Sequence, residues 1–159
     1  MADLVAVGGF GKTRTLSEWV CAQVASGQAR RIALVAATAA DARDVLVEGE
    51  SGILSVAPPW CRPVYESSKR RLSWPNGAIA TTYSAEEPER LRGPQHDAAV
   101  CDELGSWSRP ETWDMLQFGL RLGRNPRCLV RDDASADKAN PRIIGTRGAR
   151  RSCDPRFDL

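Results

Sequence analysis

An eight-residue segment near the start of the chain constrains its fold more than any other feature. The segment reads Ala6-Val7-Gly8-Gly9-Phe10-Gly11-Lys12-Thr13. An apolar run at residues 4–7, expected as a strand, leads into it, and a helical repeat of apolar residues follows, namely Leu16, Trp19, Val20 and Val24. Glycines at such a turn allow backbone N–H groups and a helix N-terminus to face a phosphate. The segment therefore predicts an α/β fold with a phosphate-binding loop between a strand and a helix.

A second segment, far along the chain, supplies the acids that such a loop requires. Residues 98–101 read Ala-Ala-Val-Cys, as in a buried parallel strand, and Asp102 and Glu103 follow directly. Because parallel strands end at the edge of a sheet where ligands bind, we expect both carboxylates beside the loop. In that arrangement Asp102 would hold Mg²⁺ and Glu103 would polarise an attacking water. The alternative interpretation of the two acids is an N-cap with a first helical turn.

The predicted cofactors are therefore ATP and Mg²⁺. Lys12 would reach the β and γ oxygens of the nucleotide, and the Thr13 hydroxyl would be a second Mg²⁺ ligand. The residues expected to cradle the phosphates are Gly8, Gly9, Gly11, Lys12 and Thr13. Glu103 is the predicted catalytic residue.

Strand and helix patterns alternate along the rest of the chain. Strands are expected at residues 31–36 and 127–130, and helices at 39–46 and 110–122. Pro75-Asn76-Gly77 separates the extended runs 71–74 and 78–83, which is a strong signal for a hairpin. Residues 49–63, rich in Pro and Gly, are expected to be irregular. From residue 131 the chain is charged, interrupted by Pro and Gly and almost without apolar periodicity, which predicts a disordered tail at 131–159.

Composition narrows the functional classes. The chain has 159 residues, enough for one domain, and no apolar run long enough to span a bilayer. We expect no membrane partner, and the absence of a leader pattern favours the cytoplasm. The five cysteines are scattered, so we expect reduced, mostly buried thiols. The net charge of +2 does not indicate nucleic acid by itself. The run Lys69-Arg70-Arg71 could contact DNA phosphates, but charges before a hairpin more often form a solvated face. His96 is expected at the surface or as a cap, and the five tryptophans in the core or hairpin.

The amino-acid sequence of the middle of the chain resembles that of a known protein family. Three stretches carry the resemblance: Tyr65 to Ala78, Ser84 to Asp97, and Cys101 to Leu104. They are similar to the large terminase subunit of tailed phages, prophages and gene transfer agents, over about residues 4–130. The resemblance implies a three-layer P-loop NTPase fold of the ASCE type, with a mostly parallel central sheet. It also implies an ATP-hydrolysing motor that packages double-stranded DNA into capsids in a bacterial host, with a portal and a small terminase subunit as partners.

The chain departs from the family pattern at four places. We expect the chain to begin at the first strand of the family and to lack its nuclease domain. With the sequences aligned on Gly-Lys-Thr, Gly8 stands where the loop of the family has an arginine; an alternative alignment makes residues 8–11 a loop shortened by two residues. The fourth departure is Arg131-Asp132-Asp133, where the family has a Thr-Thr-Pro motif. Reading the codons from residue 131 one nucleotide later would permit Val-Thr-Thr-Pro. We therefore expect a partial ATPase domain at 1–130, incomplete at its sheet edges, with a frameshifted tail at 131–159.

Three functional interpretations follow from these residues. The first is a terminase ATPase, expected here as a truncated and inactive remnant, so that a motor ring forms only if the protein is intact. The second is non-enzymatic: a decayed gene fragment or a partner-binding module. The third is a helicase-like P-loop ATPase, which shares the loop and the Asp-Glu strand.

Overall fold

The computed structural model of the protein describes residues 11–131 and 142–145, and these form one seven-stranded sheet flanked by helices. The strand order is β2-β3-β4-β1-β5-β6-β7. The bounds are β1 (Arg31–Ala36), β2 (Val64–Glu66), β3 (Arg71–Ser73), β4 (Ile79–Ser84), β5 (Ala98–Cys101), β6 (Arg127–Val130) and β7 (Arg142–Gly145). The predicted strand at residues 4–7 lies outside the described residues.

Strands β4, β1, β5 and β6 form a parallel centre, with β1 between β4 and β5. Residues 32–36 of β1 are all buried, as expected of a strand covered on both faces. The outer strands reverse direction: β3 pairs antiparallel with β4 and with β2, and β7 pairs antiparallel with β6. All parallel strands thus end at one edge of the sheet.

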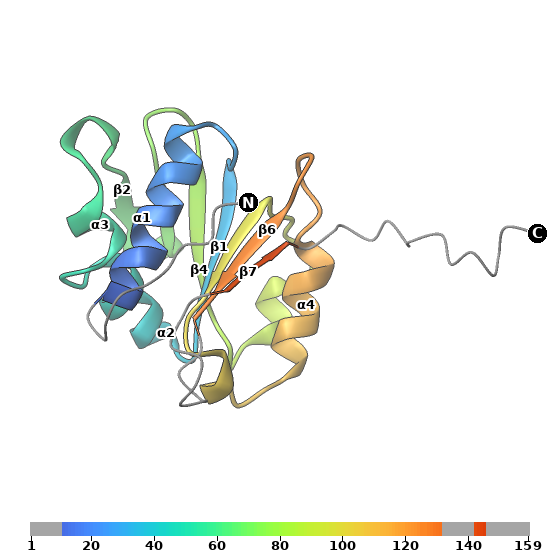
Figure 1. Cartoon of the computed structure of the whole chain (residues 1–159). Helices are drawn as coiled ribbons and strands as arrows, with labels where there is room; N and C mark the ends of the chain where they lie inside the picture. Colours follow the sequence, from blue (N-terminus) through green and yellow to red (C-terminus); the bar gives the residue numbers. More distant parts are fainter. Residues whose placement is uncertain (1–10, 132–141, 146–159) are drawn as a thin grey trace, which may run out of the picture.

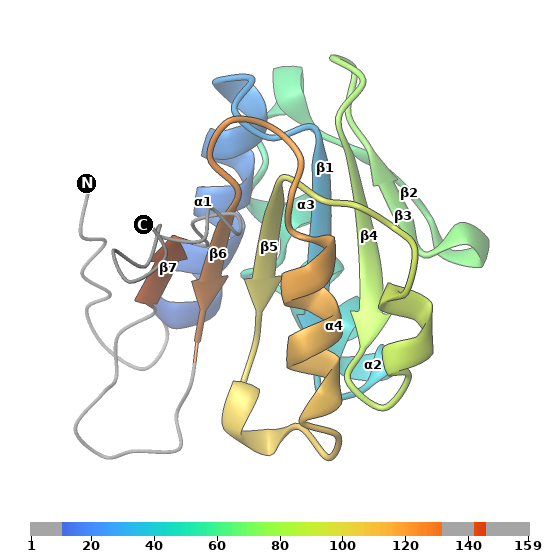
Figure 2. The same cartoon turned by 90° about the vertical axis from the view of Figure 1, so that its right-hand side faces the viewer.

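Helices cover both faces of this sheet and make the three layers that were predicted (Figure 1). On one face lie α1 (Gly11–Ala25), α2 (Ala39–Asp41), the π-helical turn η1 (Ala42–Val47) and α3 (Ile53–Val56). On the other face α4 (Glu111–Gly119) and the 3-10 turn η4 (Pro88–Leu91) pack, and Figure 2 shows α4 in front of the sheet. Further 3-10 turns are η2 (Pro59–Cys61), η3 (Ser67–Lys69) and η5 (Leu104–Ser106). Each face has its own apolar core.

The predicted hairpin joins β3 to β4. Gly77 has a φ of +90°, which glycine adopts without steric cost, and its N–H donates to the Trp74 carbonyl at 3.0 Å. The Asn76 side chain accepts from the Ala78 N–H at 3.0 Å and donates to the Val24 carbonyl at 3.0 Å. Asn76 therefore fastens the turn to the end of α1.

Two expectations about single side chains were wrong. His96 is only 4% exposed, because its main-chain N–H donates to the Gly119 carbonyl at 2.8 Å and holds the residues around His96 against the end of α4. The same pairing ends α4 at Gly119, short of the predicted residue 122. Trp60, expected to pack, is 83% exposed because it lies on the short turn η2 at the rim.

The cysteines that the structure describes are free thiols, as expected. Cys101 and Cys128 are buried on neighbouring strands with their sulfur atoms 3.6 Å apart, and burial raises the pKa of Cys101. Cys21 and Cys61 are half-buried, and burial raises the pKa of Cys21 to about 11. These thiols belong to the packing of the sheet and of α1.

Residues 142–145 form a strand, although composition predicted no regular structure for this segment. The outer edge of β6 offers unpaired main-chain groups, and β7 pairs with them from Arg127↔Gly145 to Val130↔Arg142. The remainder of the predicted tail after Arg131 lies outside the described residues. The predicted irregular segment 49–63 contains the helical turns α3 and η2.

Candidate active site

A cavity of about 250 Å³ opens at the edge where the parallel strands end. It is lined by residues at or just after the carboxyl ends of β1, β5 and β6, by the first turn of α1 and by the α2–η1 segment. These residues are Thr13, Ala36, Ala37, Asp41, Val45, Asp102, Glu103 and Arg131. In parallel α/β sheets this edge is where ligands bind, so the topology alone makes the cavity the first candidate.

Asp102 lines this cavity, and main-chain hydrogen bonds fix its position. Its N–H donates to the Val35 carbonyl at 2.9 Å and thereby continues the pairing of β5 with β1 by one residue. Its own carbonyl accepts from the indole N–H of Trp107 at 3.0 Å. With a side chain only 7% exposed, the carboxylate has little freedom to turn away from the site.

Glu103, two residues after β5, has an unusual backbone conformation. Its φ of +50° and ψ of +55° lie in the left-handed region, which costs a non-glycine residue roughly 1 kcal/mol or more. The turn directs the chain away from the sheet into η5 while the Glu103 carboxylate stays beside Arg131. Such strain at the end of a strand is typical of functional positions.

Arg131 brings the predicted residues together. Its Nη1 donates to Thr13 Oγ1 at 2.7 Å and lies 3.3 Å from Asp102 Oδ1, and its Nη2 lies 3.4 Å from Glu103 Oε1. A hydroxyl and two carboxylates from distant parts of the sequence thus surround one cationic group. These oxygen donors are the kind that Mg²⁺ prefers, so the residues present fit the metal that was expected.

The remaining predicted site residues are placed as follows. Gly11 is the first residue of α1, and Lys12 is half-buried in the same helical turn as Thr13. Gly8 and Gly9 lie outside the described residues. Within residues 11–131 and 142–145, no group of three His, Cys, Asp or Glu side chains is placed to hold a metal by itself.

Arg131 is the site residue that sequence reasoning missed. The charged and aperiodic residues around it predict the start of a divergent tail instead. A usable signal was available: residue 131 directly follows a parallel strand, and the rule that placed Asp102 at the sheet edge applies equally to it.

The fold defines the class of the protein, which is a three-layer α/β domain with a mostly parallel central sheet, as expected. Residues 6–135 match the family described as terminase large subunit, T4likevirus-type, N-terminal. The chain belongs to this family, as its resemblance predicted. Among curated proteins none matches the chain.

One solved structure is also similar. It is the ATPase domain of the large terminase of Thermus phage P74-26, with 18% sequence identity and a TM-score of 0.49. The similarity covers 64% of this chain and 47% of that chain, so the protein spans about half of the solved domain. In the part of the chain that the structure describes, no helix has the length and apolar character to cross a membrane.

Proposed function

We propose that this protein binds ATP with Mg²⁺ at the cavity on the sheet edge and hydrolyses it as the motor domain of a terminase large subunit. The observation that carries the proposal is the convergence of Thr13, Asp102 and Glu103 on one cation. Family membership supports it, because an ATPase domain requires this kind of site.

Each residue has a part in the mechanism. Lys12, at the start of α1, supplies a positive charge to the β and γ phosphate oxygens, and the N-terminus of α1 adds its dipole. Thr13 and Asp102 would hold Mg²⁺, which neutralises charge on the phosphates when bound. Glu103 orients a water molecule in line with the γ-phosphate and accepts hydrogen bonds from it. Asp102 is more deeply buried than Glu103. Burial suits Asp102 as a metal ligand, and exposure suits Glu103, which must contact a water molecule.

Double-stranded DNA is the proposed substrate of the motor, and a second cavity supports this. It has a volume of about 480 Å³, and its lining includes Arg31, Lys69, Arg71 and Arg90 but no carboxylate. It lies away from the sheet edge that holds the acids, beside the amino-terminal halves of β1 and β4. Lys69 is also paired with Glu66 at 2.7 Å, so the three arginines carry most of the charge. Phosphate oxygens are the natural ligands of such a surface.

The portal and a small terminase subunit are proposed as protein partners, with action in the cytoplasm of a bacterial host. These proposals rest on family membership.

A second candidate is a protein that retains the site without hydrolysing ATP. The observation that favours it is Arg131, which holds both carboxylates and the Thr13 hydroxyl. With Gly8 where the family has a loop arginine, this candidate corresponds to the inactive remnant, and a frameshift after residue 130 would account for it.

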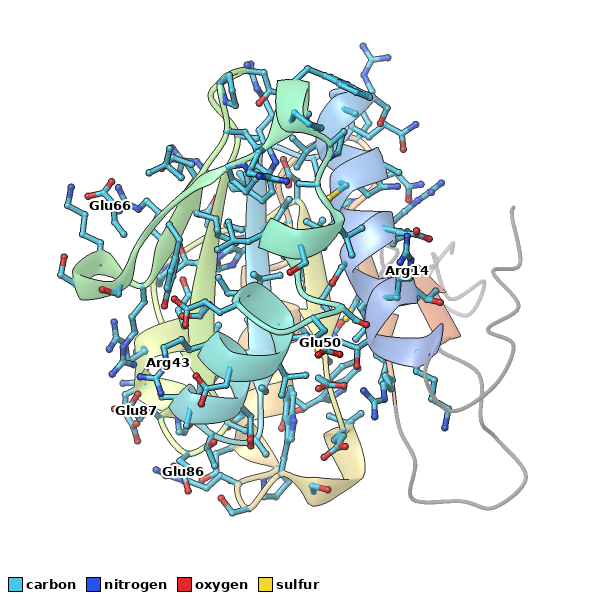
Figure 3. The ribbon with its side chains drawn as sticks, turned by 90° about the vertical axis from the view of Figure 1, so that its left-hand side faces the viewer. Arg14, Arg43, Glu50, Glu66, Glu86 and Glu87 are labelled. Carbon is cyan, nitrogen blue, oxygen red and sulfur yellow. The ribbon has the colours of Figure 1, made fainter. Side chains whose placement is uncertain are left out.

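One set of variants separates the two candidates. We expect Lys12→Ala to weaken binding of a fluorescent ATP analogue, and Glu103→Gln to bind it normally while hydrolysing ATP about 10²-fold to 10⁴-fold more slowly. Arg14→Ala is the matched control, because the Arg14 side chain lies on the exposed side of the same helix (Figure 3) and pairs with Glu18 at 3.0 Å.

The result decides each part separately. Equal, background-level ATP hydrolysis in the parent chain and in both site variants would remove the motor function, and retained analogue binding would then favour the second candidate. The rate is measured with and without double-stranded DNA at low salt. A parent rate that DNA leaves unchanged would contradict the DNA contact.

A further inference from the structure

The guanidinium of Arg131 lies where the proposed metal ligands meet. Its Nη1 is shared between Thr13 Oγ1 at 2.7 Å and Asp102 Oδ1 at 3.3 Å. Those are the two atoms that would bind Mg²⁺ under the proposed function. A metal ion needs them at about 2.0–2.1 Å, with their lone pairs directed at the ion rather than at a nitrogen. Arg131 and the metal would therefore use the same acceptor atoms.

The main chain fixes Arg131 in this position. Its N–H donates to the Cys101 carbonyl at 2.8 Å, and its carbonyl accepts from the Leu104 N–H at 3.3 Å. Both bonds continue the pairing of β6 with the segment that contains Asp102 and Glu103. The Arg131 side chain is 14% exposed, so it is enclosed by the site rather than extended into solvent.

Charge opposes the presence of both cations at these atoms. Arg131 already neutralises one of the two negative charges of Asp102 and Glu103, and Asp41 adds one further carboxylate to the cavity lining. A divalent ion held by Thr13 and Asp102 would lie against the guanidinium, and repulsion between two cations is unfavourable in a partly enclosed cavity. Removal of the guanidinium from the carboxylates would relieve this repulsion.

We propose that Arg131 is an internal counter-cation that occupies the divalent-metal position and must leave the Thr13, Asp102 and Glu103 oxygens before the metal binds. This inference rests on the proposed function, because it takes the metal site from there. Its consequence is a site that binds free divalent metal weakly. The metal enters when another anion, such as the phosphates of the nucleotide, offers the guanidinium a new partner and adds the missing negative charge.

The test measures metal binding without nucleotide and without turnover. Mn²⁺ is the probe, and its free concentration is followed by electron paramagnetic resonance. We expect Arg131→Gln to bind Mn²⁺ at least about tenfold more tightly than the parent chain, because one positive charge is removed from the site. Arg131→Lys, which keeps the charge, is expected to bind as weakly as the parent, and Arg124→Gln, at an exposed position, is the matched control.

A second measurement covers the possibility that one variant unfolds. Mn²⁺ should raise the melting temperature of Arg131→Gln, or of Arg131→Met as the alternative neutral variant, more than that of the parent. Adding Asp102→Asn to either neutral variant should abolish the gain. Equal Mn²⁺ affinity in the parent and in the folded neutral variants would overturn the inference. Binding of Mn²⁺ together with ATP by the parent is measured separately, and its absence would count against the proposed function instead.

Discussion

His96 provides the sharpest test of the packing on the α4 face. It is the one histidine of the chain and is 4% exposed, with Nε2 lying 3.2 Å from the Tyr83 hydroxyl and Nδ1 buried without a hydrogen-bond partner. Burial and the nearby charge of Arg31 lower the pKa of His96 from 6.5 to about 4. The test is to lower the pH from 7.5 to 5 and to measure the stability of the fold.

The sign and size of the effect follow from these two values. Between pH 6.5 and 4 the unfolded chain binds a proton at His96 that the folded chain does not bind, so the free energy of unfolding decreases as the pH falls. At pH 5 the decrease is about 2 kcal/mol, and it approaches about 3 kcal/mol at pH 4, since one pKa unit corresponds to 1.36 kcal/mol. Above about pH 7.5 the imidazole is largely neutral in both states and contributes little pH dependence.

Urea unfolding at pH 7.5 and 5 measures this loss. Carboxylates also titrate in this range, so the parent is compared with His96→Gln, which keeps a polar partner for Tyr83 but does not ionise. We expect the pH-dependent loss to be about 2 kcal/mol smaller in the variant. The single imidazole resonance in an NMR titration gives the folded pKa directly. Titration near 6.5, or equal losses in both proteins, would refute the burial argument.

Two further predictions concern the hairpin and the end of β5. Asn76→Ala should lower the free energy of unfolding by about 1–3 kcal/mol, because the Val24 carbonyl and the Ala78 N–H lose their hydrogen-bond partner. Urea unfolding measures this change. The control is Gln28→Ala, at an exposed neighbouring position, which should change the free energy of unfolding by less than about 0.5 kcal/mol. Glu103→Gly should be more stable than Glu103→Ala by about 1 kcal/mol, because only glycine adopts a φ of +50° without strain. Thermal unfolding of the two variants measures the difference, and a reversed order of stability would contradict this reasoning.

The elements that sequence predicted well are those whose signals are local. Asn76 and Gly77 determine their turn within a few residues, and β5 with Asp102 and Glu103 is a buried run followed by acids. Both were found where expected. The residue types alone indicated them, because the required conformation and the required neighbours lie within the same short segment.

The features that sequence missed depend on distant partners. His96 is buried because the main chain at Gly119 approaches it closely; a Cβ on Gly119 would lie 2.8 Å from the Pro94 carbonyl oxygen. Arg131 acquires its place from main-chain pairing with Cys101, and its position directly after a buried strand is the one local signal that separates it from the charged residues that follow. Such contacts arise from tertiary packing, which a single sequence does not display.

The contact between Arg131 and Thr13 also has a consequence for the order of folding. These two residues are 118 positions apart, whereas Asp102 and Glu103 adjoin each other. Contacts of high sequence separation require a large loop to close, and the entropy of closure is repaid only after the intervening strands have paired. We therefore expect the site to be the last part of the domain to assemble. A chain still emerging from the ribosome would carry the acids and the start of α1 well before it could bring Arg131 to them.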